Sequence, residues 1–229
     1  MEKLLITIDG TSGVGKGTMA KLLADKYNCQ RLDSGAIYRA AAIYLGKLNI
    51  EKEDLQDPEV FAQVCDKLKN IPLTFAENEA GVLQVYLDQE NITQLLRLET
   101  TAAKASSFAV IPEIRTALLE RQRKFALDYP RLVAEGRDMG TVVFPQAQIK
   151  FFLDASPKAK AERRYKELCE KGEKANFDEI LALLEQRDYQ DKNRKVAPLV
   201  PASDAIIIDT TNLGIEETFA AIEKHLQEK

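Results

Sequence analysis

The chain has 229 residues, of which 45% are hydrophobic and 30% are charged, an ordinary globular composition that excludes disordered and fibrous classes. Its net charge of −4 disfavours a nucleic-acid backbone as the main partner. No run of about 18 apolar residues is present, and the three cysteines lie far apart. These features predict a cytoplasmic protein with no membrane association, no nucleic-acid partner, no obligate protein partner and no protein-bound metal cluster.

The first predicted element is a buried strand, because the apolar run LLITI at residues 4–8 ends in Asp-Gly. A glycine-rich stretch and a helical pattern over residues 17–28 follow it. Further apolar runs at residues 132–134, 149–153 and 205–208 predict strands separated by helical patterns, and residues 30–33 could form one more. Strands that alternate with helices favour parallel pairing through right-handed crossovers. The sequence therefore predicts an α/β fold with a three-layer core and a parallel sheet of about five strands.

Two segments depart from this alternation. Residues 73–87, LTFAENEAGVLQVYL, alternate between apolar and polar side chains on both sides of NEAG, a pattern that is typical of an antiparallel hairpin. A hairpin does not belong in a parallel sheet, so it indicates an insertion with its own small sheet. Residues 156–194 predict a charged, arginine-rich helical pair that begins at Ser156-Pro157. Arg163 and Arg164 in this pair suit a solvated helix face as well as a functional role.

The stretch IDGTSGVGKGT, residues 8–18, has the form of a phosphate-binding loop, with Lys16 at the lysine position. Glycines let backbone N–H groups approach phosphate oxygens, and the following helix points its positive end at the same anion. One detail departs from the usual pattern: Gly17 stands where Ser or Thr is expected, and the hydroxyl comes one residue later at Thr18. The residues predicted to bind the nucleotide are Gly10, Thr11, Ser12, Gly13, Val14, Gly15, Lys16, Gly17 and Thr18.

The form GKGT resembles the loop of nucleoside-monophosphate kinases. Three further motifs make the resemblance more specific: LDSGAIYR at 32–39, EGRDMGT at 135–141 and RDYQDKNRKVAPLVP at 187–201. Together they resemble the bacterial cytidylate kinases over essentially the whole chain. Thr11 stands where relatives often have proline, which we interpret as a surface-loop change of little consequence.

The resemblance implies a division of the chain into three parts. Residues 1–34, 105–155 and 195–229 would form the P-loop core, residues 35–104 an insertion that binds the nucleoside monophosphate, and residues 156–194 a lid with its following helix. It also implies roles for particular side chains. Those implied to act in catalysis are Lys16, Arg137, Arg187 and Arg194. Those implied to bind the acceptor are Ser34, Arg39, Ser106, Arg115, Arg137, Asp138, Arg187, Asp191 and Arg194.

The resemblance implies transfer of the γ-phosphoryl group of ATP to CMP or dCMP, with Mg²⁺ held mainly by the nucleotide and waters. Phosphoryl transfer is mostly positioning and charge neutralisation, so several arginines and one lysine suit it. Some alternatives remain open. The acceptor could be UMP or another small molecule, or the chain could be a nucleotide-dependent switch. One alternative is that Asp33 and Ser34 serve merely as helix caps. Another is that Asp138 merely orients Arg137 through a local salt bridge.

Overall fold

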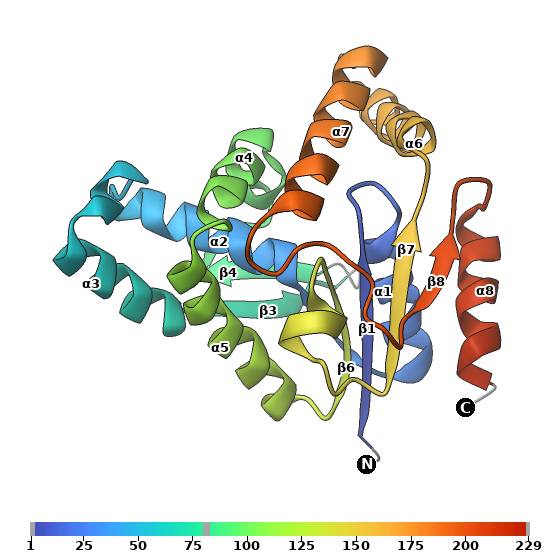
Figure 1. Cartoon of the computed structure of the whole chain (residues 1–229), viewed down its shortest axis with the longest axis horizontal. Coiled ribbons are helices and arrows are strands. Elements are labelled where there is room, and N and C mark those ends of the chain that lie inside the picture. Colours follow the sequence, from blue (N-terminus) through green and yellow to red (C-terminus); the bar gives the residue numbers. More distant parts are fainter. Residues whose placement is uncertain (1–2, 80–82, 228–229) are drawn as a thin grey trace. The chain divides into compact units, whose positions relative to one another are not determined.

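The computed structural model describes residues 3–79 and 83–227, and the chain divides into two compact units (Figure 1). The first unit consists of Met1–Asp33 with Ala126–Lys229, and the second is Ser34–Phe125. Among the described residues, no helix is both long and apolar enough to cross a bilayer.

The first unit is built on a parallel five-stranded sheet, as predicted, and its strand order is β2-β6-β1-β7-β8. Its strands are β1 (Leu4–Gly10), β2 (Gln30–Asp33), β6 (Arg131–Gly136), β7 (Ile149–Asp154) and β8 (Ile206–Asp209). The register pairs Asp9 with Gly136 and Asp33 with Glu135. Because the strands are parallel, their carboxyl ends meet at one edge of the sheet, where the phosphate-binding loop follows β1 and the EGRDMGT motif continues from β6.

Helices cover this sheet. On one face, α1 (Lys16–Tyr27) and α8 (Ile215–Gln227) pack onto apolar strand residues in a core that includes Ile8, Leu23 and Ile222. On the other face lies η3 (Met139–Val143), a single π-helical turn that packs against β1. A Cβ atom at Gly140 would meet the Thr7 hydroxyl at 3.0 Å, so glycine permits this close approach. The predicted core of a parallel sheet between helices is therefore confirmed.

The predicted charged helical pair is present as α6 (Pro157–Glu170) and α7 (Phe177–Asn193), which contact each other. The Ser156 side chain caps α6 by accepting a hydrogen bond from the backbone N–H of Ala159. The Asn176 side chain caps α7. Gly172, just beyond the end of α6, has a φ of 73°, which favours glycine and ends the helix there.

The second unit contains the predicted antiparallel hairpin. Strands β3 (Leu73–Glu77) and β4 (Leu83–Leu87) pair in a three-stranded sheet whose third member is β5 (Glu90–Asn91), and part of the predicted turn lies outside the described residues. The other elements are α2 (Ser34–Lys47), η1 (Glu53–Gln56), α3 (Pro58–Lys69), η2 (Leu95–Arg97), α4 (Glu99–Phe108) and α5 (Pro112–Asp128).

This unit extends beyond residue 104, where the sequence analysis ended the insertion. The reason is that α5 packs on the small sheet. The Phe125 ring meets the Phe75 ring edge-on at a centroid distance of 5.7 Å, and the Arg121 guanidinium donates to the Leu73 carbonyl at 2.9 Å. By its contacts, most of α5 therefore belongs with the second unit and not with the parallel sheet.

Candidate active site

The phosphate-binding loop connects β1 to α1 with backbone conformations that favour glycine. Gly15 has a φ of 91° and directly precedes α1, whose first residue is Lys16. Gly10 lies against the neighbouring strand so closely that a Cβ atom would stand 2.1 Å from the Leu153 carbonyl oxygen. Because the helix begins at the end of the loop, its first N–H groups and positive dipole end would face an anion bound in the loop.

Lys16 is almost completely buried, and its ammonium group donates to the Thr11 carbonyl oxygen at 2.6 Å. Burial and, secondly, the nearby positive charge of Arg137 lower the pKa of Lys16 to about 7. A bound phosphate would add negative charge beside the ammonium group and so favour its charged form. Lys16 is therefore suited to take up its charged form when a polyphosphate binds.

The structure explains why glycine stands at position 17. A Cβ atom at this position would stand 3.3 Å from Glu135 Oε1 and 3.5 Å from Oε2. The Glu135 carboxylate at the end of β6 thus occupies the space where a Ser or Thr side chain would project. Burial and, secondly, the negative charge of Asp33 raise the pKa of Glu135 to about 7. The loop therefore pairs a small residue at position 17 with a buried carboxylate.

This fit predicts that positions 17 and 135 are coupled. In the Gly17→Ala variant the added methyl group crowds Glu135, whereas in the Glu135→Ala background it has room. We expect a coupling free energy of ~1 kcal/mol in a double-mutant cycle measured by thermal or urea denaturation. Effects that add to within about 0.4 kcal/mol would show that the two side chains do not compete for this space.

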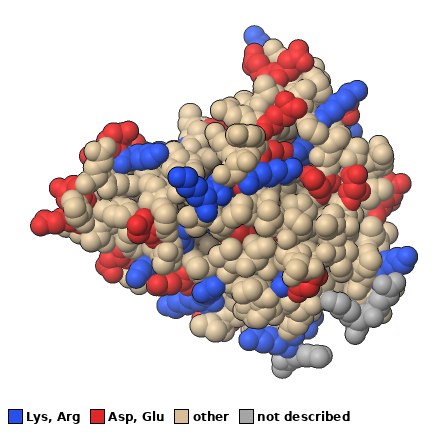
Figure 2. Space-filling view, in the orientation of Figure 1, with Lys and Arg blue, Asp and Glu red and all other residues tan. Residues whose placement is uncertain are grey.

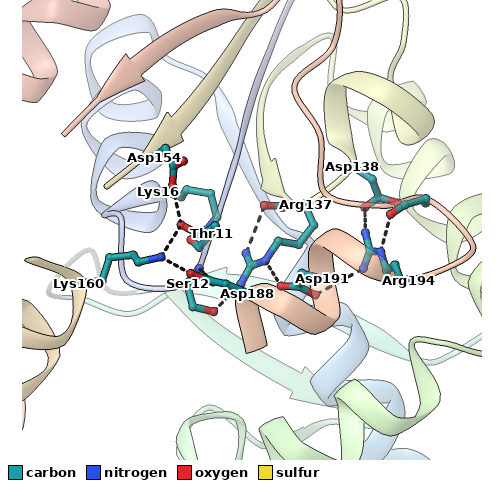
Figure 3. A network of polar contacts seen from close by, with 12 residues as sticks. Thr11, Ser12, Lys16, Arg137, Asp138, Asp154, Lys160, Asp188, Asp191 and Arg194 are labelled. Atoms are coloured by element: carbon teal, nitrogen blue, oxygen red, sulfur yellow. Dashed lines mark hydrogen bonds and ion pairs between the residues drawn. The ribbon is translucent and has the colours of Figure 1, made fainter. Parts of the chain in front are cut away.

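Arg137 links the loop to α7, as Figure 3 shows. Its Nη2 donates to the Ser12 hydroxyl at 2.7 Å, and its Nε donates to Asp191 at 2.8 Å. Asp191 also lies 3.8 Å from the guanidinium of Arg194. The two arginines therefore flank one carboxylate directly beside the phosphate-binding loop. Acidic and basic side chains are both distributed over the face shown in Figure 2, so anion binding would rest on local cationic groups such as these.

Asp138 is buried and lies 3.8 Å from the Arg194 guanidinium. The segment that carries it is fixed by Asp9, whose carboxylate accepts from the backbone N–H groups of Met139 at 2.8 Å and Gly140 at 2.7 Å. Burial raises the pKa of Asp9 to about 6. Asp9 thus holds the residues after β6 in place, and with them Arg137 and Asp138.

The interpretation of Thr11 as a surface-loop change is wrong. Its side chain is fully buried, and its hydroxyl donates to Asp154 at 3.3 Å and accepts from the Lys160 ammonium group at 3.3 Å. A hydroxyl at this position therefore ties the loop to β7 and to α6. Proline could make neither hydrogen bond.

The other predicted acceptor residues belong to the second unit. Ser34 is buried at the first residue of α2, with Arg39 one turn later, and Ser106 is exposed on α4. Arg115 is buried, donates to the Ala109 carbonyl at 3.0 Å and lies over the Tyr38 ring at 5.5 Å from its centroid. Of the predicted residues, the first unit brings together the loop, Lys16, Arg137, Asp138, Asp191 and Arg194, and it places Arg187 on α7.

The sequence analysis missed four charged residues of this site: Asp9, Glu135, Lys160 and Asp188. Asp9 and Glu135 lie within recognised motifs at strand ends, which is a usable signal. Lys160 and Asp188 lie in charged helices, where nothing distinguishes a buried charge from a solvated one. Arg163 anchors α6 by donating to the Thr210 and Leu213 carbonyl groups, whereas Arg164 pairs with Glu167 on the same helix.

Comparisons with known proteins agree with this geometry. The family model described as "Cytidylate kinase" matches residues 6–228. A cytidylate kinase of Pasteurella multocida is 46% identical over 226 residues, which cover 99% of this chain and 96% of that protein. A cytidylate kinase of Dichelobacter nodosus is 48% identical, with 96% of this chain and 94% of that protein covered.

The fold also has a counterpart among solved structures. An uncharacterized protein from Eubacterium ventriosum superposes over the full length of both chains with a TM-score of 0.53 at 16% identity, which concerns the fold alone. The family match and the two curated relatives, by contrast, extend over nearly all of this chain at the level of sequence. The chain belongs to the cytidylate kinase family of phosphotransferases.

Proposed function

We propose that this protein transfers the γ-phosphoryl group of ATP to CMP, and also to dCMP, giving ADP and the nucleoside diphosphate. One observation carries the proposal: Arg137 reaches the phosphate-binding loop itself, with its Nη2 2.7 Å from the Ser12 hydroxyl. A guanidinium within hydrogen-bonding reach of the loop can contact a second phosphate while the loop holds the first. Such an arrangement suits transfer between two polyanions, for which neutralising charge is the main catalytic requirement.

The donor fits the loop. Backbone N–H groups of the loop and the first turn of α1 would bind the phosphates of ATP, and Lys16 would contact the terminal ones. Thr18 lies in the first turn of α1 and would serve the phosphates with its hydroxyl. Glu135 and Asp33 place carboxylates at the same sheet edge, which suits Mg²⁺ that is held chiefly by the nucleotides and waters.

The acceptor is assigned by chemistry and by the family motifs. By the match to the family motifs, its phosphate would be held by Ser34, Arg39, Arg137 and Arg194. The ribose would be bound by Arg187 and Asp191, and the cytosine by Ser106, Arg115 and Asp138. Asp191 supports this assignment. Its carboxylate lies between Arg137 and Arg194, so the two guanidinium groups already hold one anionic group. The phosphate of CMP would take over that role for the two guanidinium groups.

The helices α6 and α7 would act as a lid. Closure excludes water, which would otherwise accept the phosphoryl group and turn the reaction into ATP hydrolysis. Arg163, bonded to the Thr210 and Leu213 carbonyl groups, fixes one side of α6 to the core. The lid would therefore move about an anchored base.

A coupled assay with ATP and a panel of nucleoside monophosphates tests the proposed function. CMP should give the highest kcat/KM, with dCMP next and UMP roughly 10- to 100-fold lower, because uracil reverses the donor and acceptor at two positions that cytosine offers. Equal values for CMP and UMP would point to a general pyrimidine kinase. Turnover with a non-nucleotide alcohol would refute the assignment of the acceptor.

Asp138 gives a sharper prediction about base recognition. A carboxylate can accept from the exocyclic amine of cytosine and is mismatched against O4 of uracil. We expect Asp138→Ala to lower kcat/KM for CMP much more than for UMP. The ratio of kcat/KM for CMP to that for UMP should fall at least about tenfold.

Asp138 lies 3.8 Å from Arg194, so it could act on the phosphate-binding site instead of on the base. If CMP and UMP turnover fall by the same factor, Asp138 supports the phosphate-binding arginine and the base is recognised elsewhere. Asp204→Ala, which removes a carboxylate paired with Lys150 in the same unit, is the matched control and should leave the ratio unchanged.

A further inference from the structure

The phosphate-binding loop has an internal anion against it. The backbone N–H of Ser12 donates to Oδ1 of Asp188, a residue of α7, at 3.4 Å. The Asp188 side chain is buried, and its other oxygen is paired with the Lys160 ammonium group. The loop thus presents one of its amide groups to a carboxylate of the helical pair that we assign as the lid.

The ion pair between Lys160 and Asp188 is buried and does not lie on the surface. Its side chain is only 2% exposed, and its ammonium group also donates to the Thr11 hydroxyl at 3.3 Å. A buried ammonium group needs a counter-ion, since an unpaired buried charge is strongly unfavourable. Asp188 supplies that counter-ion while it contacts the loop. Figure 3 shows Lys160, Asp188 and the two loop residues side by side.

A donor phosphate would need the same two partners. Loop N–H groups are the ligands of phosphate in such a loop, and Ser12 supplies one of them. A phosphate at this position would bring negative charge to Lys160 as well, so the lysine would keep a counter-ion after Asp188 had left. The exchange of a carboxylate for a phosphate leaves no buried charge unpaired, which makes it energetically accessible.

We propose that Asp188 is a positioning residue that occupies the donor-phosphate position of the loop and is displaced by the phosphates of ATP. The displacement couples donor binding to the position of α7, because Asp188 belongs to that helix. The proposal rests on the assignment of the loop as the ATP site and extends it to the control of that site.

The expected effect is a change in ATP affinity. A competing internal anion raises the apparent dissociation constant by the reciprocal of the fraction of molecules whose loop is open, so that about 90% occupancy by Asp188 corresponds to a tenfold effect. The Asp188→Asn variant keeps the size of the side chain and removes its charge. We expect it to bind ATP, in the absence of an acceptor, up to about tenfold and at least about threefold more tightly than the wild-type protein.

The control is Glu185→Gln, which removes the same charge from the exposed face of α7 one turn away. Titration calorimetry with ATP should give a dissociation constant within about twofold of wild type for this variant. If Asp188→Asn binds ATP no more tightly than Glu185→Gln does, the proposal is overturned. Because no acceptor is present, this result is independent of whether CMP is the substrate.

The Asp188→Asn protein leaves the Lys160 charge without its partner and could fail to fold. The comparison is then made between Lys160→Gln and the double variant Lys160→Gln/Asp188→Asn, in which no buried ammonium group remains. We expect ATP to bind the double variant more tightly than the single one. Equal or weaker binding by the double variant contradicts the proposal, whatever the effect of Lys160→Gln alone.

Discussion

The Arg137→Ala variant is expected to lose about 10³-fold or more in kcat for phosphoryl transfer from ATP to CMP, since an arginine that stabilises the transferring group contributes ~10³ to 10⁵ in related transfers. Arg137 contacts the Ser12 hydroxyl and Asp191. Its guanidinium therefore lies between the loop assigned to the donor and Asp191, which is assigned to the acceptor. Steady-state kinetics with both substrates near saturation measures the effect on kcat.

Two companion variants sharpen this test. Arg137→Lys keeps the charge but loses the planar fork of N–H donors, so it should recover part of the lost rate and remain far below wild type. Arg164→Ala removes an arginine that pairs with Glu167 on α6, and it should leave kcat nearly unchanged. A kcat for Arg137→Ala within about tenfold of the wild-type value would remove Arg137 from the proposed catalytic group.

Lys16→Ala is expected to lower kcat by ~10² to 10³, the usual loss when one electrostatic contact to the developing charge is removed. The ammonium group is buried at the base of the loop and bonded to the Thr11 carbonyl, a position from which it can reach the terminal phosphates of a bound nucleotide. Near-normal kcat in this variant would refute the assignment of the loop.

Stability measurements at different pH values test the lowered pKa of Lys16. The folded-state pKa of Lys16 lies at about 7, below the value of 10.5 that the unfolded chain would have. This depressed pKa contributes stability above pH 10.5 that is lost as the pH falls toward 7. The difference in melting temperature between wild type and Lys16→Ala should therefore shift in favour of the wild type as the pH rises from 7 to 10. A constant difference would mean that Lys16 does not titrate in this range.

Much of the fold is predictable because its strands are short apolar runs that end in recognisable turns. LLITI and IKFFL each became a buried parallel strand, and the alternating residues on both sides of NEAG became an antiparallel pair. The π-helical turn η3 was not predicted, because it depends on Gly140 packing against β1 and on Asp9 accepting hydrogen bonds from its first residues. These are contacts between segments more than a hundred residues apart.

The same distinction applies to the site. Glycines and a lysine at fixed spacing identify a phosphate-binding loop from local sequence alone. The significance of Thr11, Lys160 and Asp188 depends on burial, and a lysine in a charged helix is expected to be solvated. Only the packing of α6 and α7 against the loop shows that Lys160 is buried and that Asp188 meets Ser12. Gly17 is a further case, because the need for a small residue there comes from Glu135 on β6.

The central claim is that the loop and Arg137 serve transfer between two nucleotides and not hydrolysis or switching. Phosphorus NMR of the protein with ATP, Mg²⁺ and CMP tests it most directly. We predict that ADP and CDP appear in equal amounts, with little inorganic phosphate, and that ATP persists when CMP is omitted. Release of inorganic phosphate at the same rate with and without CMP would contradict the account.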